Sequence, residues 1–277
     1  MPRDAGVDTN RRSRMQKHNT HLILAAIAAA ATSTAVAEEA PKKWVSSAGL
    51  NFTLTSGNSE TFLVGGNLLT ATKWDKNEFS ANADVAYGQN TTKSVVGGSL
   101  ISTKSTTAQN YGAGLQYNRL VIGDRGYLYA KADGRQDKIA GVDYRFTFSP
   151  GFGYYLVRQK NLEIKGEAGP GYVIEKLQGV PKDDYVTLRV AENLKWVISE
   201  HSRVFQTAEF QPQVDDFDNY VANFSVKLET DITTSLKLNV TLSDTYRSRP
   251  APYAGTAPLV FREKNDIQLT AGISYSF

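Results

Sequence analysis

The twelve C-terminal residues alternate between apolar and polar side chains, and this alternation constrains the fold more than any other feature. The apolar positions are Ile267, Leu269, Ala271, Ile273, Tyr275 and Phe277. Successive side chains of a β-strand point to opposite faces, so the segment has one apolar and one polar face. A soluble antiparallel sheet can show the same pattern. Because the chain stops on Phe277 with no polar tail, we expect the closing strand of a transmembrane β-barrel.

Residues 1–37 are predicted to be a secretory signal peptide. The apolar run 22–31 follows several basic residues and precedes the small-x-small pattern Ala35-Val36-Ala37. This run is shorter than the ~20 residues that a membrane helix needs. Met15 is an alternative start, which makes residues 1–14 an upstream extension. A twin-arginine signal at Arg11-Arg12 is less consistent, because the pair lies far from the apolar run.

Cleavage after Ala37 leaves residues 38–277 as a single outer-membrane barrel domain with no formal net charge. Of 31 basic and 28 acidic residues, five and two precede the cleavage point, so 26 of each remain. A basic surface for nucleic acid is therefore not expected. The chain has no cysteine, which excludes thiolate catalysis, thiolate metal sites and disulfides.

Alternating segments recur along residues 38–277 and predict twelve antiparallel strands. The two longest predicted connections, 90–107 and 248–264, both follow odd-numbered strands, and the connections after even-numbered strands are shorter. Outer-membrane barrels have an even strand number, short periplasmic turns and longer outer loops. We therefore expect both termini to be periplasmic, with strands near residues 44–55, 61–72, 78–88, 109–118, 126–136, 143–156, 162–175, 185–197, 203–211, 220–230, 235–247 and 266–277.

This topology brings four aromatic residues to one rim, and three other residues are unusual for the positions that it gives them. Interfacial aromatic girdles are typical of such barrels, and the candidate rim residues are Trp44, Trp74, Trp196 and Phe277. Core tryptophans of a β-sandwich are the alternative. Glu192 falls on an apolar face, which a bulge, a shifted register or a protonated carboxyl would explain. Pro150 and Pro170 lie inside strands, where we expect local bulges.

Four segments of the sequence resemble a known family. They are the hairpin Gly49 to Ser59, the triplet Asp143-Tyr144-Arg145, the stretch Ser149 to Tyr155 and the stretch Glu167 to Tyr172. They are similar to the YdiY-like family of salt-induced outer membrane proteins, a domain of unknown function with the number 481. The similarity extends over residues 38–277. It implies an outer-membrane β-barrel, and it implies no catalytic residue, metal or cofactor.

The histidine content argues against a lipid-modifying barrel enzyme. Histidine is the usual base at neutral pH, and barrel hydrolases and acyltransferases place one in the outer half of the barrel. After Ala37 the chain has only His201, in a predicted periplasmic turn. Asp183-Asp184 and Asp215-Asp216 lie in predicted outer loops without EF-hand spacing, so solvated acidic loops are expected there. We predict no catalytic, metal or cofactor site.

The polar parity of the strands predicts the lining of the barrel interior. Besides Asp84, the candidate lumen residues are Lys131, Asp133, Arg135, Arg145, Glu163, Lys165, Glu167, Arg189, Lys195, Lys227, Glu229 and Lys237. Such residues either line a water-filled pore or pair across the lumen and fill it. Twelve strands lie between the filled eight-stranded barrels and the open porins, so both outcomes stand. The balance of signs indicates no strong ion preference.

These patterns lead to a functional hypothesis and an alternative. The first is a small passive channel for ions or small polar solutes in the outer membrane of a Gram-negative bacterium. The alternative is a non-conducting structural or salt-stress barrel that interacts with lipopolysaccharide through Arg247, Arg249, Arg262 and Lys264. We expect the protein to be a monomer that contacts outer-membrane lipids. We also expect its C-terminal strand to be recognised by the outer-membrane assembly machinery.

Overall fold

The chain folds into twelve β-strands. The computed structural model describes residues 44–55, 59–96, 99–253, 258 and 260–277, and the predicted signal peptide lies outside them. The strands are β1 Val45–Thr55, β2 Ser59–Trp74, β3 Asn77–Val96, β4 Ser99–Ile122, β5 Gly126–Asp137, β6 Val142–Arg158, β7 Leu162–Leu177, β8 Asp183–Val197, β9 Ser202–Pro212, β10 Tyr220–Asp231, β11 Leu236–Arg247 and β12 Asn265–Ser276. No helix of the described residues is both long and apolar enough to cross a membrane.

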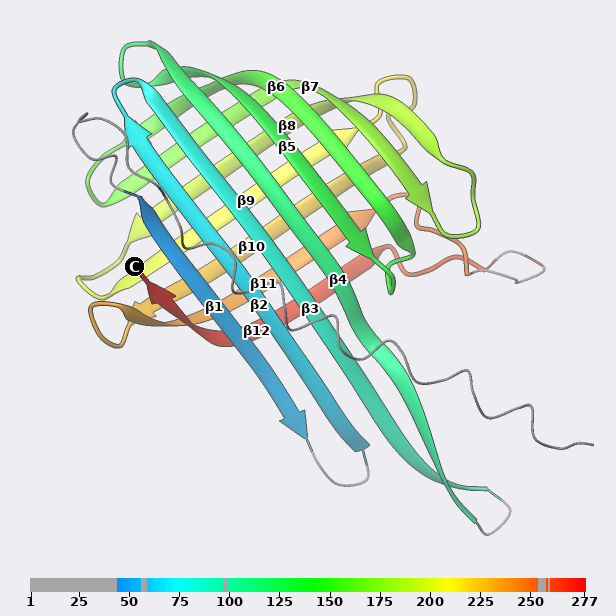
Figure 1. Cartoon of the computed structure of the whole chain (residues 1–277). Coiled ribbons are helices and arrows are strands. Elements are labelled where there is room, and N and C mark those ends of the chain that lie inside the picture. Colours follow the sequence, from blue (N-terminus) through cyan, green and yellow to red (C-terminus); the bar gives the residue numbers. More distant parts are fainter. Residues whose placement is uncertain (1–43, 56–58, 97–98, 254–257, 259) are drawn as a thin grey trace, which may run out of the picture. The chain divides into compact units, whose positions relative to one another are not determined.

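The strands form one closed antiparallel barrel, as predicted. Each strand pairs with its neighbours in sequence, and β1 closes the sheet by pairing with β12, where Leu50 lies opposite Ile273 (Figure 1). Closure removes the free sheet edges. The alternating C-terminal segment is therefore the closing strand of the barrel.

The barrel is apolar outside and polar inside. On β6 the rings of Phe146, Phe148 and Phe152 are exposed on the outer surface, and Arg145 and Ser149, at positions of the opposite parity, are buried in the lumen. The same alternation places large exposed apolar side chains on the outer face of each of the remaining eleven strands. A soluble protein would bury such residues, whereas a barrel in lipid exposes them.

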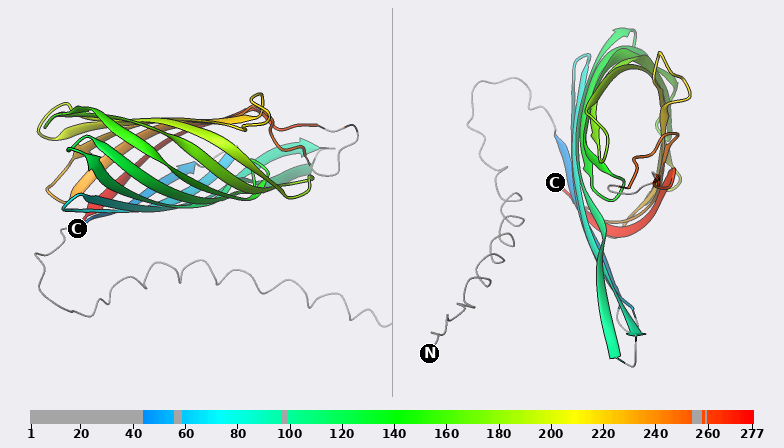
Figure 2. Two further views of the ribbon diagram at one scale, coloured as in Figure 1. Left: turned by 90° about the horizontal axis from the view of Figure 1, so that it is seen from above. Right: turned by 90° about the vertical axis from the view of Figure 1, so that its right-hand side faces the viewer.

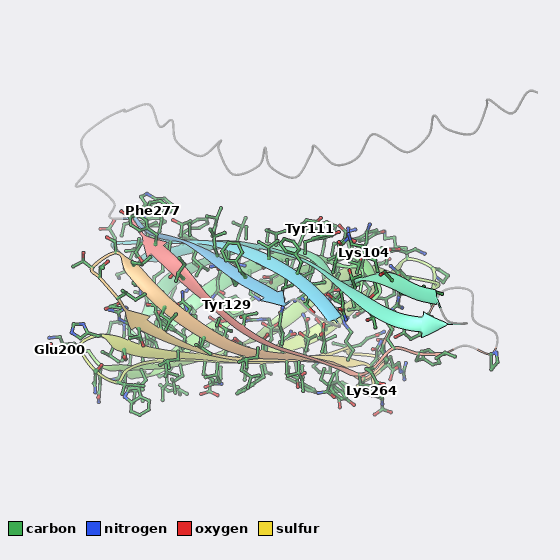
Figure 3. All side chains as sticks on the ribbon, turned by 90° about the horizontal axis from the view of Figure 1, so that it is seen from below. Lys104, Tyr111, Tyr129, Glu200, Lys264 and Phe277 are labelled. Atoms are coloured by element: carbon green, nitrogen blue, oxygen red, sulfur yellow. The ribbon has the colours of Figure 1, made fainter. Side chains whose placement is uncertain are left out.

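The two ends of the barrel differ. The terminal end carries Trp44 and Phe277 together with the short turns after the even-numbered strands. The loop end carries the connections after the odd-numbered strands, of which the longest, 248–264, joins β11 to β12 as predicted. Figure 3 shows Phe277 and Glu200 at the terminal end and Lys104 and Lys264 at the loop end.

The predicted connection 90–107 is wrong, because most of it is strand. β3 has 20 residues and β4 has 24, and they pair from Asn77 with Arg119 as far as Val96 with Ser99. The blue-green hairpin projects past the other strands at the loop end (Figures 1 and 2). Residues 101–107 are exposed at every position. Where both faces of a strand meet water, no apolar alternation is required, so the period-two signal is lost.

The bulges expected at Pro150 and Pro170 are also absent. The β6–β7 ladder is interrupted between the pairs Phe148–Tyr172 and Phe152–Ala168, but its register is the same on both sides. That register sets the two prolines opposite each other. The two backbone N–H groups that proline lacks are therefore missing from the same interruption of the ladder, and neither strand needs an extra residue there. The bulges of this strand pair lie nearer its ends, at 142–144 and 155–157.

Glu192 remains on the outer surface. The register is continuous through Glu192 on both sides of β8, where Gly166 and Ala208 are its neighbours. The side chain is exposed on the same parity as Val190. Neither a bulge nor a shifted register turns this carboxyl inward.

Candidate functional site in the barrel lumen

Glu167 is the centre of a polar network inside the barrel. It projects inward from β7, and its side chain is 1% exposed. Its carboxylate accepts hydrogen bonds from Tyr127 Oη at 2.8 Å, Gln116 Nε2 at 2.8 Å and Arg189 Nη1 at 2.9 Å. The ammonium group of Lys165 lies 3.6 Å away. A buried carboxylate needs such partners, because desolvation of an unpaired charge is costly.

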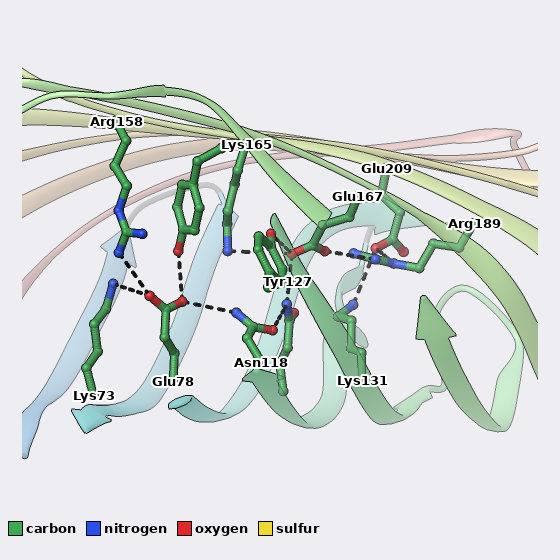
Figure 4. A network of polar contacts seen from close by, with 12 residues as sticks. Lys73, Glu78, Asn118, Tyr127, Lys131, Arg158, Lys165, Glu167, Arg189 and Glu209 are labelled. Carbon is green, nitrogen blue, oxygen red and sulfur yellow. Dashed lines mark hydrogen bonds and ion pairs between the residues drawn. The ribbon is translucent and has the colours of Figure 1, made fainter. Parts of the chain in front are cut away.

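The network continues from Arg189 toward the loop end. Arg189 Nε donates to Glu209 at 2.8 Å, and its guanidinium lies over the ring of Tyr129. Lys131 joins the same carboxylate at 3.3 Å and pairs with Asp133 at 2.8 Å. Figure 4 shows Lys131 reaching Glu209 from the opposite side of the lumen, so this chain of charges bridges strands that are not neighbours in the sheet. Alternating signs let the groups neutralise one another in series.

Toward the terminal end the network reaches Glu78 on β3. Gln116 donates to Asn118 at 3.0 Å, and Asn118 donates to Glu78 at 3.2 Å. The other partners of Glu78 are Tyr155 at 2.8 Å, Lys73 at 2.9 Å and Arg158 at 3.4 Å. Tyr155 and Arg158 belong to β6, which is not a neighbour of β3 in the sheet. These bonds therefore span the lumen and narrow it.

Two smaller clusters occupy other parts of the lumen. Near the loop end, Arg145 pairs with Glu175 at 2.7 Å and donates to Tyr185 at 3.0 Å and to Gln211 at 3.2 Å. Nearer the terminal end, Glu229 collects three cations, which are Arg203 at 3.0 Å, Lys237 at 3.1 Å and Lys227 at 3.4 Å. Ion pairs and hydrogen bonds therefore join strands in several parts of the barrel, from β6 to β9 and from β9 to β11.

The lumen candidates from the sequence fall into these groups. Lys131, Asp133, Lys165, Glu167 and Arg189 belong to the Glu167 network, and Lys227, Glu229 and Lys237 belong to one cluster. Arg135 pairs with Asp137 at 3.2 Å, while Arg145 pairs with Glu175. Glu163 and Lys195 lie opposite each other on β7 and β8. Asp84 lies on the inward parity of β3 and has no ion pair among the described residues.

Two adjoining cavities lie in the lumen beside the ion pairs, and a third of about 170 Å³ lies at the loop end. The larger, about 960 Å³, lies in the loop-end part of the lumen and is lined by residues of every strand except β1 and β7. The smaller, about 250 Å³, lies against β1, β2 and β10–β12 and reaches Ser47 and Ser274. The two cavities share five lining residues, Leu69, Asp84, Asn110, Ser243 and Gln268. They therefore meet at this level of the barrel.

The four candidate lipopolysaccharide contacts lie in different environments. Arg249 and Lys264 are exposed at the loop end, and Arg249 pairs with Asp216. Arg247 points into the lumen, 4.0 Å from Glu175. Arg262 donates to the backbone oxygens of Ile139 and Pro252 and to the Gln178 side chain, so it ties the β11–β12 connection to two other loop-end turns.

The four candidate rim aromatics lie at the terminal end. Trp44 precedes β1, Trp74 ends β2, Trp196 is near the end of β8, and Phe277 follows β12. Phe277 is 70% exposed, and its ring stacks on Tyr275. His201 is exposed in the turn between β8 and β9 at the same end.

Sequence reasoning missed the tyrosines that fill the lumen. Tyr127 and Tyr155 are almost completely buried, and their ring centroids are 5.3 Å apart. Tyr127 lies opposite Gly153 and Tyr129 lies opposite Gly151, and a Cβ at either glycine would overlap the ring. The Gly-x-Gly stretch of β6 therefore accommodates the Tyr-x-Tyr stretch of β5. This pairing of large and small residues at the same spacing was the available signal.

The comparisons with known proteins agree with this geometry. A NanC porin superposes with a TM-score of 0.50 at 10% identity, over 84% of this chain and 100% of that chain. An outer membrane channel from Pseudomonas putida F1 gives a TM-score of 0.44 at 10% identity, over 89% and 100%. At such identities the likeness to the NanC porin shows a shared fold alone. A search among curated proteins finds no match.

The family assignment rests on sequence and agrees with the predicted resemblance. The model of one family matches residues 47–277, which include all twelve strands except the first two residues of β1. This chain belongs to the DUF481 family, described as a protein family of unknown function.

Proposed function

We propose that this barrel is a passive channel for ions and small polar solutes in the outer membrane of a Gram-negative bacterium. The observation that supports it is the pair of adjoining cavities, about 960 and 250 Å³, which share lining residues such as Asp84 and Ser243 and extend from the loop-end part of the lumen as far as Ser47 and Ser274. Their lining includes many Ser, Thr, Asn and Gln side chains beside the charged groups. Neutral polar side chains replace part of a solute's hydration without holding it, which suits passage.

In this proposal the terminal end is periplasmic and the loop end faces outward. Short turns on the periplasmic side and longer outer connections are the rule for bacterial barrels. Trp44, Trp196 and Phe277 then anchor the barrel at the inner lipid interface. Arg249 and Lys264 would face the phosphates of lipopolysaccharide. The exposed C-terminal strand with Phe277 would be the segment recognised by the assembly machinery.

The alternative is a non-conducting structural barrel, and the ion-pair network favours it. The bonds of Glu78 to Tyr155 and Arg158 already cross the lumen near the terminal end. If this network also closed the remaining wall, solutes would not pass. Conductance therefore separates the two functions directly.

The test is single-channel recording of the purified protein in planar lipid bilayers. We expect discrete conductance steps from the unmodified chain, and barrel assembly is checked by heat-modifiable migration on a gel. Ser243→Trp adds a large ring where the cavities meet and should lower the conductance. Leu242→Trp is the matched control, because the adjacent side chain points outward, and it should conduct normally. Assembled protein without conductance above background would refute the channel and leave the structural barrel.

A further inference from the structure

The charges along the two cavities are not balanced residue by residue. Every cation that lines them has an acidic partner within 4.0 Å, and the weakest of these pairs is Arg247 with Glu175 at 4.0 Å. The other five are Lys131, Arg135, Arg145, Arg189 and Lys227. Among the inward carboxylates of these cavities, Asp84 and Asp266 have no ion pair in the part of the chain that the structure describes.

Asp84 lies where the two cavities meet, so its negative charge acts on ions in both of them. It lines both cavities, so any ion that moves between them passes its carboxylate. Its neighbours across the sheet are neutral, Asn67 on β2 and Gly112 on β4. A Cβ at Gly112 would come within 2.6 Å of Asp84 Oδ1, so glycine leaves the space that the carboxylate occupies. The carboxylate is exposed to the lumen and accepts no hydrogen bond from any described residue.

We propose that Asp84 is the charge-selecting residue of the passage and makes it favour small inorganic cations over anions. The inference rests on the proposed channel function and adds the class of solute to it. An unpaired carboxylate where the two cavities meet attracts cations and repels anions of the same size. The paired cations nearby do not cancel this effect, because each is already neutralised at short range. Asp266, nearer the loop end, adds to the same field.

The test is the reversal potential in a potassium chloride gradient, since the two ions have similar mobility in water. A unit charge about 5 Å from the path, screened at 0.1 M salt, changes the potassium-to-chloride permeability ratio roughly fivefold. We expect the unmodified channel to favour potassium. Asp84→Asn should reduce the permeability ratio by about that factor, and Asp84→Lys should reverse the preference. Asp84→Glu keeps the charge and should keep the preference.

The control is Asp75→Asn, which removes a carboxylate in the turn between β2 and β3. Asp75 has a φ of +47°, a conformation that asparagine also adopts readily. This variant should leave the permeability ratio unchanged. A conducting protein without cation preference, or one whose preference survives in Asp84→Asn, overturns the role of Asp84 and leaves the channel standing. A protein that assembles but does not conduct overturns the channel and the role of Asp84 together.

Discussion

Replacing Glu167 by glutamine tests whether the lumen network holds the barrel together. The substitution keeps the shape of the side chain and one acceptor oxygen but removes the negative charge. Arg189, whose side chain is 4% exposed, then keeps only Glu209 as a counter-ion, at 2.8 Å. Lys165, 3.6 Å from Glu167, loses its partner in the network. The new amide also presents a donor where the carboxylate accepted hydrogen bonds.

The expected loss of stability is about 3 kcal/mol. Removing one partner of a fully buried ion pair costs about 3–5 kcal/mol, and a hydrogen bond to a charged group contributes about 1.5–3 kcal/mol. The lower part of this range applies, because Glu209 still neutralises Arg189 and the Lys165 side chain is 20% exposed to the lumen. In the glutamine variant only one side-chain oxygen can accept hydrogen bonds. If Tyr127 and Gln116 both keep theirs, the hydrogen bond from Arg189 is lost.

Guanidinium unfolding in detergent micelles, followed by tryptophan emission, measures this loss. The three tryptophans all lie near the terminal end, at residues 44, 74 and 196, so their emission reports the release of that rim. A free energy of unfolding within about 1 kcal/mol of the unmodified protein, the range of an exposed ion pair, would refute the structural role of the network. A changed slope with denaturant would show that the transition is not comparable.

Two further substitutions test how the outer surface and the packing of tyrosine against glycine contribute to stability, independently of this network. Glu192→Leu replaces a lipid-facing carboxylate and should raise the free energy of unfolding by about 1–2 kcal/mol in lipid vesicles; a loss of stability would show that the carboxyl has a partner there. Gly153→Val should destabilise the barrel by about 2 kcal/mol or more, because the new side chain overlaps the Tyr127 ring. Gly166→Val, where a Cβ meets nothing within 4 Å, should be tolerated, and equal losses in the two variants would contradict the packing argument.

The strand number could be predicted because the membrane imposes a local rule. Each spanning strand must present an apolar side chain at every second position, as Phe146, Phe148 and Phe152 do on β6. The rule stops where the strand leaves the lipid, so the alternation predicts a loop for the residues beyond Gly88 that pair in β3 and β4. The extension of this hairpin is fixed by backbone pairing and β-propensity rather than by a burial pattern.

The partners inside the lumen could not be predicted from the same alternation. Parity shows that Glu167 and Arg189 point inward, but the register places Ala191 and not Arg189 directly opposite Glu167, so the pair is diagonal. The bond from Arg158 to Glu78 joins residues 80 positions apart on strands that are not neighbours. Such contacts depend on the stagger and curvature of the closed sheet, which the sequence of one strand does not encode.

The position of the smaller cavity follows from the size of the inward side chains around the barrel. The inward residues of β4–β8 include Tyr127, Tyr155, Glu167 and Arg189, which are long enough to bond one another or, in the case of Tyr155, to reach Glu78 on β3. The inward residues of β1, β11 and β12 are mostly Ser, Thr, Asn and Gly, which cannot reach the opposite wall. In a barrel of this strand number the long side chains occupy part of the lumen, and the short ones leave space beside β1, β11 and β12. Asp84 lines both cavities, so the proposed ion selection by this carboxylate depends on the arrangement of short and long side chains around it.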